Sequence, residues 1–424
     1  MTTPGDFVLR EASVLDESGG FTGPLDIVVR GGRVDAVEAN AAASGAPEHD
    51  FSGLWVLPGI IDCHEHVAMS SLDGMALLRT PITYWAIEAT ANARRLLEAG
   101  VTFVRDPGGA DAGIRDAVAA GHVPGPRMQV AAVLISQTGG HIDGFLPGPG
   151  IEMTSSYFIP DYPGRPPYAA DSPDEMRHVV RAVLRAGADW IKLCTTGGVM
   201  SPTDEPHIPE LTYEEIAVAT FEAARKGKHV MTHANAGEGI DNAVKAGVRS
   251  VEHGLWLSEE QAALMAKAGC WLVPTLAIQY EVIALAEQGK IPEYSARKAL
   301  ALKPLLGESL RVARENGVKI ALGTDFISRD QHGKNLIELA HMHDAGLTVE
   351  ESLLAGTISG AELCGVDGHY GRIAPGYVFD AIVLDEDPGD LSVFRQPGAV
   401  TGVFKGGEAV APHERVGLMA GAAP

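Results

Sequence analysis

The stretch VLPGIIDCHEH, residues Val56 to His66, ends an apolar run on two histidines. Residues 56–63 are mostly apolar, which is typical of a strand buried on both faces of a parallel sheet. Side chains alternate along a strand, so His64 and His66 would point to one side and Glu65 to the other. The stretch therefore predicts a buried strand that carries two converging imidazoles at its end.

Seven more apolar runs follow, and Ala-, Glu- and Arg-rich segments with helical character separate them. The eight runs cover residues 56–63, 101–105, 128–135, 189–194, 229–233, 250–253, 270–276 and 319–324. Capping-box signatures open four helical segments, at Ser172–Glu175, Thr212–Glu215, Ser258–Gln261 and Thr348–Glu351. Eight buried strands that alternate with helices predict an α/β protein with a (β/α)8 TIM barrel, and a doubly wound open sheet is the alternative.

The two ends of the chain have a different sequence pattern. Residues 7–16 and 26–39 contain short runs with β-like composition and Gly-rich turns, and residues 381–387 and 400–410 repeat this pattern. Neither end has enough strands to bury a face alone, so we expect the two ends to pair. The predicted domains are a composite β-sandwich of residues 1–56 plus 371–424 and a barrel of residues 57–370.

Composition excludes several classes of protein. The chain has 424 residues, 46% of them hydrophobic, and a formal net charge of -22 from 33 Lys+Arg and 55 Asp+Glu. A disordered chain is excluded, and nucleic acid or an anionic membrane surface would be repelled. Because the sequence has neither a signal-peptide pattern nor a long apolar stretch, we expect a cytoplasmic protein with a small-molecule substrate. The sequence leaves open whether the protein forms a homo-oligomer. The four cysteines are expected to be reduced core thiols.

Polar residues stand where the apolar runs end. In a barrel, chemistry gathers at the carboxyl ends of the strands. The candidates there are His64, His66, His141, Lys192, His233, His253 and Asp325. The pair His341 and His343 has the same spacing as the first two but falls in a segment with helical character, where positions two apart diverge. We therefore predict that this second pair lies on the surface.

Lys192 is the unusual member of the set. Trp190, Ile191 and Leu193 flank it at a strand end, so we expect burial to depress its pKa and to favour the neutral amine. A neutral amine can add carbon dioxide and become a carbamate, which can bridge two cations. Asp325 ends the eighth run and offers a carboxylate, although an N-cap role for the next helix is the alternative.

The connection 138–171 is unusually long. It is rich in Gly and Pro and carries four aromatics, Tyr157, Phe158, Tyr162 and Tyr168. Such a loop is usually functional, so we expect a lid or a binding wall for a hydrophobic part of the substrate, with an interface-forming loop as the alternative. The predicted substrate contacts are His141, Asn235 and His332. Asp106 is interpreted as structural.

The motifs LPGIIDCHEH, DWIKL, MTHANAG, SVEHG and ALGTD, with PGYVFDAIVL near the end, resemble the amidohydrolase superfamily. Within it, the chain is similar to the imidazolonepropionase-like and Xaa-Pro-dipeptidase-like branch. The resemblance implies two divalent ions, commonly zinc. It places His64, His66, Lys192 and Asp325 around one ion, and carboxylated Lys192, His233 and His253 around the other. The motif GGHID implies that His141 faces the substrate carbonyl.

The expected reaction is hydrolysis of an amide-like C–N bond in a dipeptide, N-acyl amino acid, aryl amide, carbamate or urea. A metal-bridging hydroxide would attack, His141 would stabilise the oxyanion, and Asp325 would carry the proton to the leaving nitrogen. Zinc suits these ligands, and cobalt, manganese and iron are alternatives. A lactonase or phosphotriesterase would use the same site. A one-metal deaminase is another alternative, but by resemblance such enzymes carry an acid at a fixed spacing after the fifth-strand histidine, and Glu238 does not have that spacing from His233. A non-catalytic metal-binding barrel is the remaining class.

Overall fold

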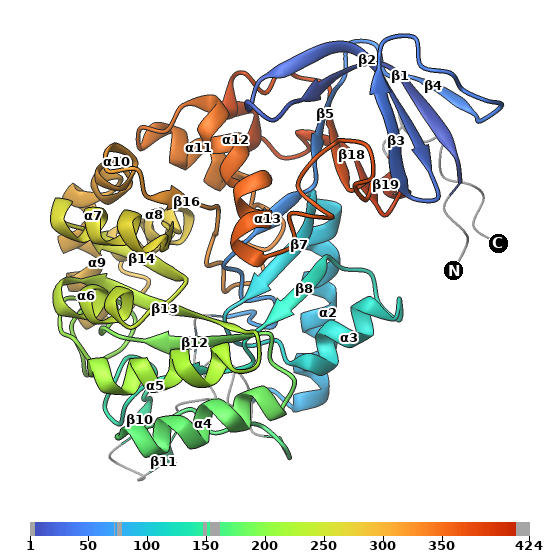
Figure 1. Cartoon of the computed structure of the whole chain (residues 1–424). Coiled ribbons are helices and arrows are strands. Elements are labelled where there is room, and N and C mark those ends of the chain that lie inside the picture. The colour runs from blue at the N-terminus through green and yellow to red at the C-terminus, as the bar shows by residue number, and fades with distance from the viewer. Residues whose placement is uncertain (1–4, 72, 74–78, 147–150, 153–161, 413–424) are drawn as a thin grey trace.

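The computed structural model describes residues 5–71, 73, 79–146, 151–152 and 162–412. Its centre is a mixed α/β fold with two parallel sheets (Figure 1). One sheet has the order β6-β7-β8, and the other has the order β16-β15-β14-β13-β12-β9. The strands are β6 Ile60–Asp62, β7 Val101–Asp106, β8 Arg127–Val130, β9 Leu134–Ile135, β12 Trp190–Cys194, β13 His229–Ala236, β14 Ser250–Trp256, β15 Trp271–Val273 and β16 Lys319–Ile320.

Each predicted apolar run contributes to a strand, and the first and third runs each contribute to two. Residues 128–135 contribute to β8 in one sheet and form β9 in the other. Between them, Ala132 adopts a φ of +66°, which turns the chain out of the extended conformation. The first and eighth runs lie side by side, because the Cys63 N–H donates to the Leu322 carbonyl at 2.9 Å. Only residues 319–320 of the eighth run form a strand.

The helices lie outside these strands (Figure 1). They are α2 Ile82–Glu98, α3 Ala112–Ala119, α4 Pro173–Arg185, α5 Tyr213–Ala224, α6 Gly237–Lys245, α7 Glu259–Ala268, α8 Leu276–Glu287, α9 Glu293–Leu302, α10 Glu308–Glu315, α11 Ile337–Asp344, α12 Val349–Ala355 and α13 Ile358–Cys364. The four predicted capping signatures are confirmed. Thr212, Ser258 and Thr348 form complete capping boxes, and the Ser172 hydroxyl accepts from the Glu175 N–H. Three of these helices, α8, α9 and α10, lie between β15 and β16.

Strands from both ends of the chain form one mixed sheet in the order β19-β18-β17-β5-β1-β2-β3, with β4 paired to β1. The strands are β1 Phe7–Leu15, β2 Phe21–Arg30, β3 Arg33–Glu38, β4 Glu48–Asp50, β5 Trp55–Pro58, β17 Ala381–Leu384, β18 Val400–Lys405 and β19 Glu408–Pro412. The expected pairing of the two ends is present. The described strands make one branched sheet, so the two facing layers of a sandwich are not seen among them.

The first apolar run is not one strand. Residues 56–58 belong to β5 in the terminal sheet, and β6 begins the neighbouring parallel sheet. Gly59 joins the two at a close approach, because a Cβ there would lie 2.2 Å from Thr102 Oγ1. The same run therefore connects the terminal sheet to the strand that leads into His64.

The terminal sheet has its own apolar core. The rings of Phe7, Phe379 and Phe404 lie 5.2–5.8 Å apart and join segments from both ends of the chain. All four cysteines are buried and free, as expected. Among the described residues, no helix is both long enough and apolar enough to cross a membrane.

Candidate metal centre

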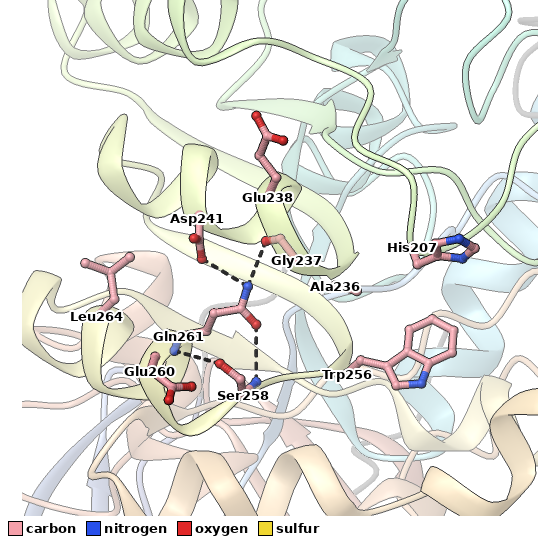
Figure 2. A pocket seen from close by; sticks show the side chains of 10 residues that line it. All are labelled: His207, Ala236, Gly237, Glu238, Asp241, Trp256, Ser258, Glu260, Gln261 and Leu264. Atoms are coloured by element: carbon pink, nitrogen blue, oxygen red, sulfur yellow. Dashed lines mark hydrogen bonds between the residues drawn. The ribbon is translucent and has the colours of Figure 1, made fainter.

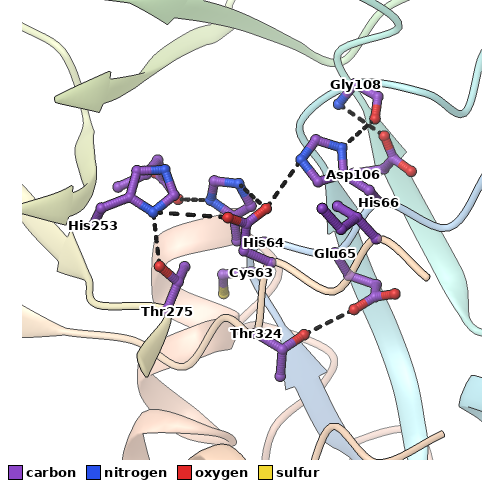
Figure 3. A network of polar contacts seen from close by, with 12 residues as sticks. Cys63, His64, Glu65, His66, Asp106, Gly108, His253, Thr275 and Thr324 are labelled. Carbon is purple, nitrogen blue, oxygen red and sulfur yellow. Dashed lines mark hydrogen bonds and ion pairs between the residues drawn. The ribbon is translucent and has the colours of Figure 1, made fainter. Parts of the chain in front are cut away.

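Three predicted ligands, His64, His253 and Asp325, each offer a ligand atom within 4.8 Å of the others. His64 follows β6, His253 lies within β14, and Asp325 follows the eighth run. Figure 3 shows the side chains of His64, His66 and His253 side by side. The imidazoles of the first histidine pair face one carboxylate, since Asp325 Oδ1 lies 3.4 Å from His64 Nε2 and 3.2 Å from His66 Nε2. Glu65 points the other way and contacts Thr324 at 2.8 Å. The arrangement puts a carboxylate between two imidazoles.

Buried partners fix the orientation of His64. Its Nδ1 lies 2.7 Å from Glu252, and Arg105 holds that carboxylate through two hydrogen bonds of 2.9 and 3.0 Å. Arg105 and Glu252 are both fully buried, so water does not compete for the groups of this ion pair. A carboxylate behind a histidine fixes which nitrogen faces a metal. Neither Arg105 nor Glu252 was predicted from the sequence, although Glu252 directly precedes His253 in the SVEHG motif.

The backbone is strained at this centre. His253, Asp325 and Thr275 have φ values of +73°, +58° and +51°. Such left-handed conformations cost non-glycine residues about 1–3 kcal/mol each and are concentrated at functional sites. Thr275 also lies 2.7 Å from His253 Nδ1 through its hydroxyl. Two of the strained residues are therefore predicted ligands, and the third orients one of them.

Lys192 lies in β12 with its side chain 1% exposed. Its Nζ has no hydrogen-bond partner among the described residues. Burial lowers the pKa of this amine. An amine that is buried without an acceptor is rare in a folded protein, and it requires an explanation.

The imidazoles differ in their electrostatics. Burial is the largest cause that lowers the pKa of His64, His233 and His253, which favours their neutral, metal-binding form. Burial acts in the same direction on His66, but the nearby Asp325 carboxylate raises its pKa above the usual value. Burial thus favours the neutral form in three of these four imidazoles, and a carboxylate lies beside the fourth.

His141 and Asn235 surround His233. The rings of His141 and His233 stack with centroids 4.1 Å apart. Ser201 and Asp204 face His141 Nδ1 at 3.0 and 3.4 Å. The Asn235 amide donates to the Gly197 carbonyl at 3.0 Å. These contacts orient the His141 ring beside a predicted ligand.

Eight of the predicted site residues line one cavity of about 770 Å³. They are His64, His66, His141, Lys192, His233, Asn235, His253 and Asp325. His332, the remaining candidate, does not line it. Its two ring nitrogens face Glu65 Oε1 at 2.5 Å and the Met69 carbonyl at 2.7 Å. We therefore assign His332 to a positioning role behind Glu65 and not to substrate contact.

A second hollow, of about 930 Å³, is unsuited to this chemistry (Figure 2). It is lined mainly by residues of α6, of α7 and of the segments that precede these helices. The polar groups of Ser258 and Gln261 are used by the α7 capping box, and the Gln261 amide also donates to Gly237 and Asp241. The cavity that the predicted ligands line is therefore the candidate site.

Two interpretations of the sequence need correction or restriction. His341 is buried, not on the surface, because its ring stacks on Tyr280 at 4.4 Å, whereas His343 is exposed as expected. In the 138–171 connection, residues 141–144 line the cavity, but Tyr168 packs against the core. Tyr157 and Phe158 lie outside the described residues. Asp106 accepts backbone N–H groups of Val67, Gly108 and Ala110, which agrees with a structural role.

Residues 55–410 match the Amidohydrolase family. The chain belongs to this family. An ochratoxinase of Aspergillus niger is 34% identical over 371 residues, which cover 83% of this chain and 75% of that protein. The expected membership of the amidohydrolase superfamily is thereby confirmed.

Solved structures of similar amidohydrolases cover almost the whole chain. A prolidase complexed with N-methylphosphonate-L-proline has a TM-score of 0.89 and 31% identity, and the match covers 96% of this chain and 100% of that one. A Xaa-Pro dipeptidase with bound methionine has a TM-score of 0.86 and 29% identity, with 95% and 99% coverage. These similarities support hydrolysis of an amide bond in general terms.

Proposed function

We propose that this amidohydrolase cleaves an amide-like C–N bond with two divalent metal ions and a carboxylated Lys192. The observation that carries the proposal is the Lys192 amine, which is buried without a hydrogen-bond partner among the described residues, in the cavity that five histidines and Asp325 also line. A carbamate on this nitrogen would turn an orphaned donor into a bidentate ligand. The donor set of imidazoles and carboxylates fits zinc.

The residues fit two ligand sets that share Lys192. His64, His66 and Asp325 would hold one ion, and His233 and His253 the other. When bound, the ions would lower the pKa of a water molecule and polarise the substrate carbonyl. Among the described residues that line the cavity, the only serines are Ser71 and Ser201, and there is no cysteine. The Ser201 hydroxyl donates a hydrogen bond to Asp204.

The chain's own residues would complete the reaction. Asp325 lies among the ligands and would accept the proton of the attacking water, then pass it to the leaving nitrogen. His141, oriented by Ser201 and Asp204, would donate a hydrogen bond to the oxygen that gains charge. Asn235 would lie beside the substrate, because it lines the cavity next to His233.

The relatives support an amide whose leaving nitrogen belongs to an amino acid. One is a prolidase complexed with N-methylphosphonate-L-proline, and another is a Xaa-Pro dipeptidase. We therefore propose N-acyl amino acids and dipeptides as the first substrates to test. In the same proposal, the two parallel sheets are arcs of one closed barrel of residues 57–370, and residues 1–56 plus 371–424 form the second domain in a cytoplasmic enzyme.

The test is Lys192→Ala with metal analysis. We expect the variant to lose at least one metal ion per chain and to lose turnover of N-acyl amino acids by about three orders of magnitude or more, because both ions share this ligand. Added acetate should restore part of the activity. The matched control is Lys319→Ala, since Lys319 is exposed and its amine is paired with Glu362 at 3.1 Å.

Two results would overturn the proposal. Full activity and full metal content in Lys192→Ala would remove the bridging role. An unmodified amine at Lys192 in the active, metal-loaded wild type, measured by mass spectrometry under native conditions, would do the same. Esters offered beside the amides, with and without a chelator, would identify a lactonase-like or phosphotriesterase-like enzyme.

A further inference from the structure

The candidate cavity extends beyond the metal centre into an apolar chamber. This chamber is the part lined by Ile278, Val282, Ile283, Ile291, Ala299 and Leu302. All of these residues come from α8, α9 or the turn between them. The chamber adjoins the metal centre, because Leu255 and Ile327, two residues beyond His253 and Asp325, line the same cavity.

Helix α8 presents buried apolar side chains to the cavity. Leu276 joins the main core, and Tyr280 stacks on His341 of α11. Ile278, Val282 and Ile283 lie in a separate small cluster with Ala286 and Ala299, and they border the cavity. These side chains are already at most 7% exposed, so an apolar group bound against them would enter surroundings that exclude water.

The wall formed by α8 and α9 is anchored to the residues around His141. Lys298 of α9 is buried, and its amine donates to the carbonyls of Gly198 and Ser201 at 2.9 and 2.8 Å and to Asp204 at 3.0 Å. Asp204 in turn faces His141. The chamber therefore has a fixed position relative to the group that would contact the substrate oxygen.

We propose that the chamber binds an aliphatic or aromatic group of the substrate and makes the α8–α9 pair the determinant of substrate class. The inference rests on the proposed function and narrows it to amides with a bulky apolar substituent. The lining residues that α8, α9 and their turn contribute carry no charge except Lys290, which lies in the turn and is exposed. A small polar acyl or amino acid group would leave this surface uncovered.

The test compares two series of probes. One varies the acyl chain, from N-acetylglycine through N-butanoylglycine to N-hexanoylglycine, and the other varies the amine, from N-acetylglycine to N-acetyl-leucine and N-acetyl-phenylalanine. We expect kcat/KM to rise about fourfold per buried methylene in at least one series. Calorimetry with the isolated products, acetate against hexanoate and glycine against phenylalanine, provides the same comparison without turnover.

Ala299→Phe fills the chamber and should abolish the preference for the larger probe in both measurements. Leu300→Phe is the matched control, because Leu300 is the next residue of α9 and is 42% exposed. The preference should survive in this control. If Ala299→Phe does not fold, Val282→Asn replaces it, since a polar amide in the chamber should reduce the same preference.

The two proposals fail in different ways. If no N-acyl amino acid is hydrolysed by the metal-loaded protein, the proposed function is wrong, and the calorimetry still decides whether the chamber binds apolar groups. If neither turnover nor binding depends on the size of the apolar group, or if Ala299→Phe keeps the wild-type preference, the inference about the chamber is overturned.

Discussion

Individual residues at the centre depend on partners that lie one step away from the cavity. Glu252 connects the buried Arg105 to His64, and Asp204 connects Lys298 to His141. Neither acid lines the cavity. In both cases a buried cation keeps the acid in place, and the acid holds an imidazole ring.

Glu252→Gln should weaken both the fold and the metal centre. The amide leaves the buried Arg105 without its carboxylate, so the free energy of unfolding should fall by about 3–5 kcal/mol. Loss of the partner of His64 should reduce metal affinity about 10-fold to 100-fold. Urea denaturation and metal titration measure the two effects. The control is Glu238→Gln at an exposed position of α6, and unchanged metal affinity in Glu252→Gln would contradict the assignment.

Asp204→Asn should affect turnover without affecting metal content. The substitution removes the charge that faces His141 Nδ1, so kcat should fall by about 10² while the ions stay bound. Metal analysis together with steady-state kinetics checks this separation. Loss of an ion in Asp204→Asn would mean that this carboxylate supports the metal ligands directly.

At the scale of elements, the sequence predicts strands and helix starts well but does not predict where strands change sheets. The apolar runs locate every described strand of the two parallel sheets, because burial on two faces leaves a continuous apolar pattern. The pattern cannot show that residues 56–58 pair with β17 while Ile60 begins another sheet, because both environments are apolar. The prediction that His341 lies on the surface was wrong for a similar reason. Helical spacing shows that His341 and His343 point in different directions, but it does not show which of the two faces packs against the protein.

His341 of α11 should make stability depend on pH. Burial lowers the pKa of His341 to about 4, whereas a free histidine titrates near 6.5. The unfolded chain therefore binds the proton first as pH falls, so this residue's contribution is present above pH 6.5 and is lost as pH falls towards 4. Between pH 7 and pH 5 the loss should be about 2 kcal/mol.

His341→Phe should remove that part of the pH dependence. Phenylalanine retains a ring that can stack on Tyr280, and His341 Nδ1 has no hydrogen bond to lose among the described residues. Urea denaturation at pH 7 and pH 5 measures the effect. His343→Phe on the same helix is the control, because His343 is exposed and should leave the pH dependence unchanged. A wild-type slope in His341→Phe would refute the assignment.

On the scale of the whole molecule, the terminal sheet is tied to the parallel sheets at several points. The first apolar run passes from one to the other through Gly59. Asp380 is buried and pairs with Arg127 of β8, and Lys405 donates to the carbonyl of Gly125. The sequence could indicate that the ends pair with each other, but not these contacts, which depend on three-dimensional positions of residues far apart in the chain.

Phe404→Ala should therefore destabilise the protein while leaving the chemistry of the site intact. Phe404 is fully buried against Phe7 and Phe379, and its removal leaves a cavity in the core that joins the two ends. The free energy of unfolding should fall by about 3–5 kcal/mol. Metal content of the folded fraction should not change, because none of these rings lines the candidate cavity. Urea denaturation measures the loss, with Phe221→Ala as the control at a ring that is 56% exposed. A loss below about 1 kcal/mol would mean that the terminal sheet adds little to the fold, since a ring buried in a required core cannot be removed so cheaply.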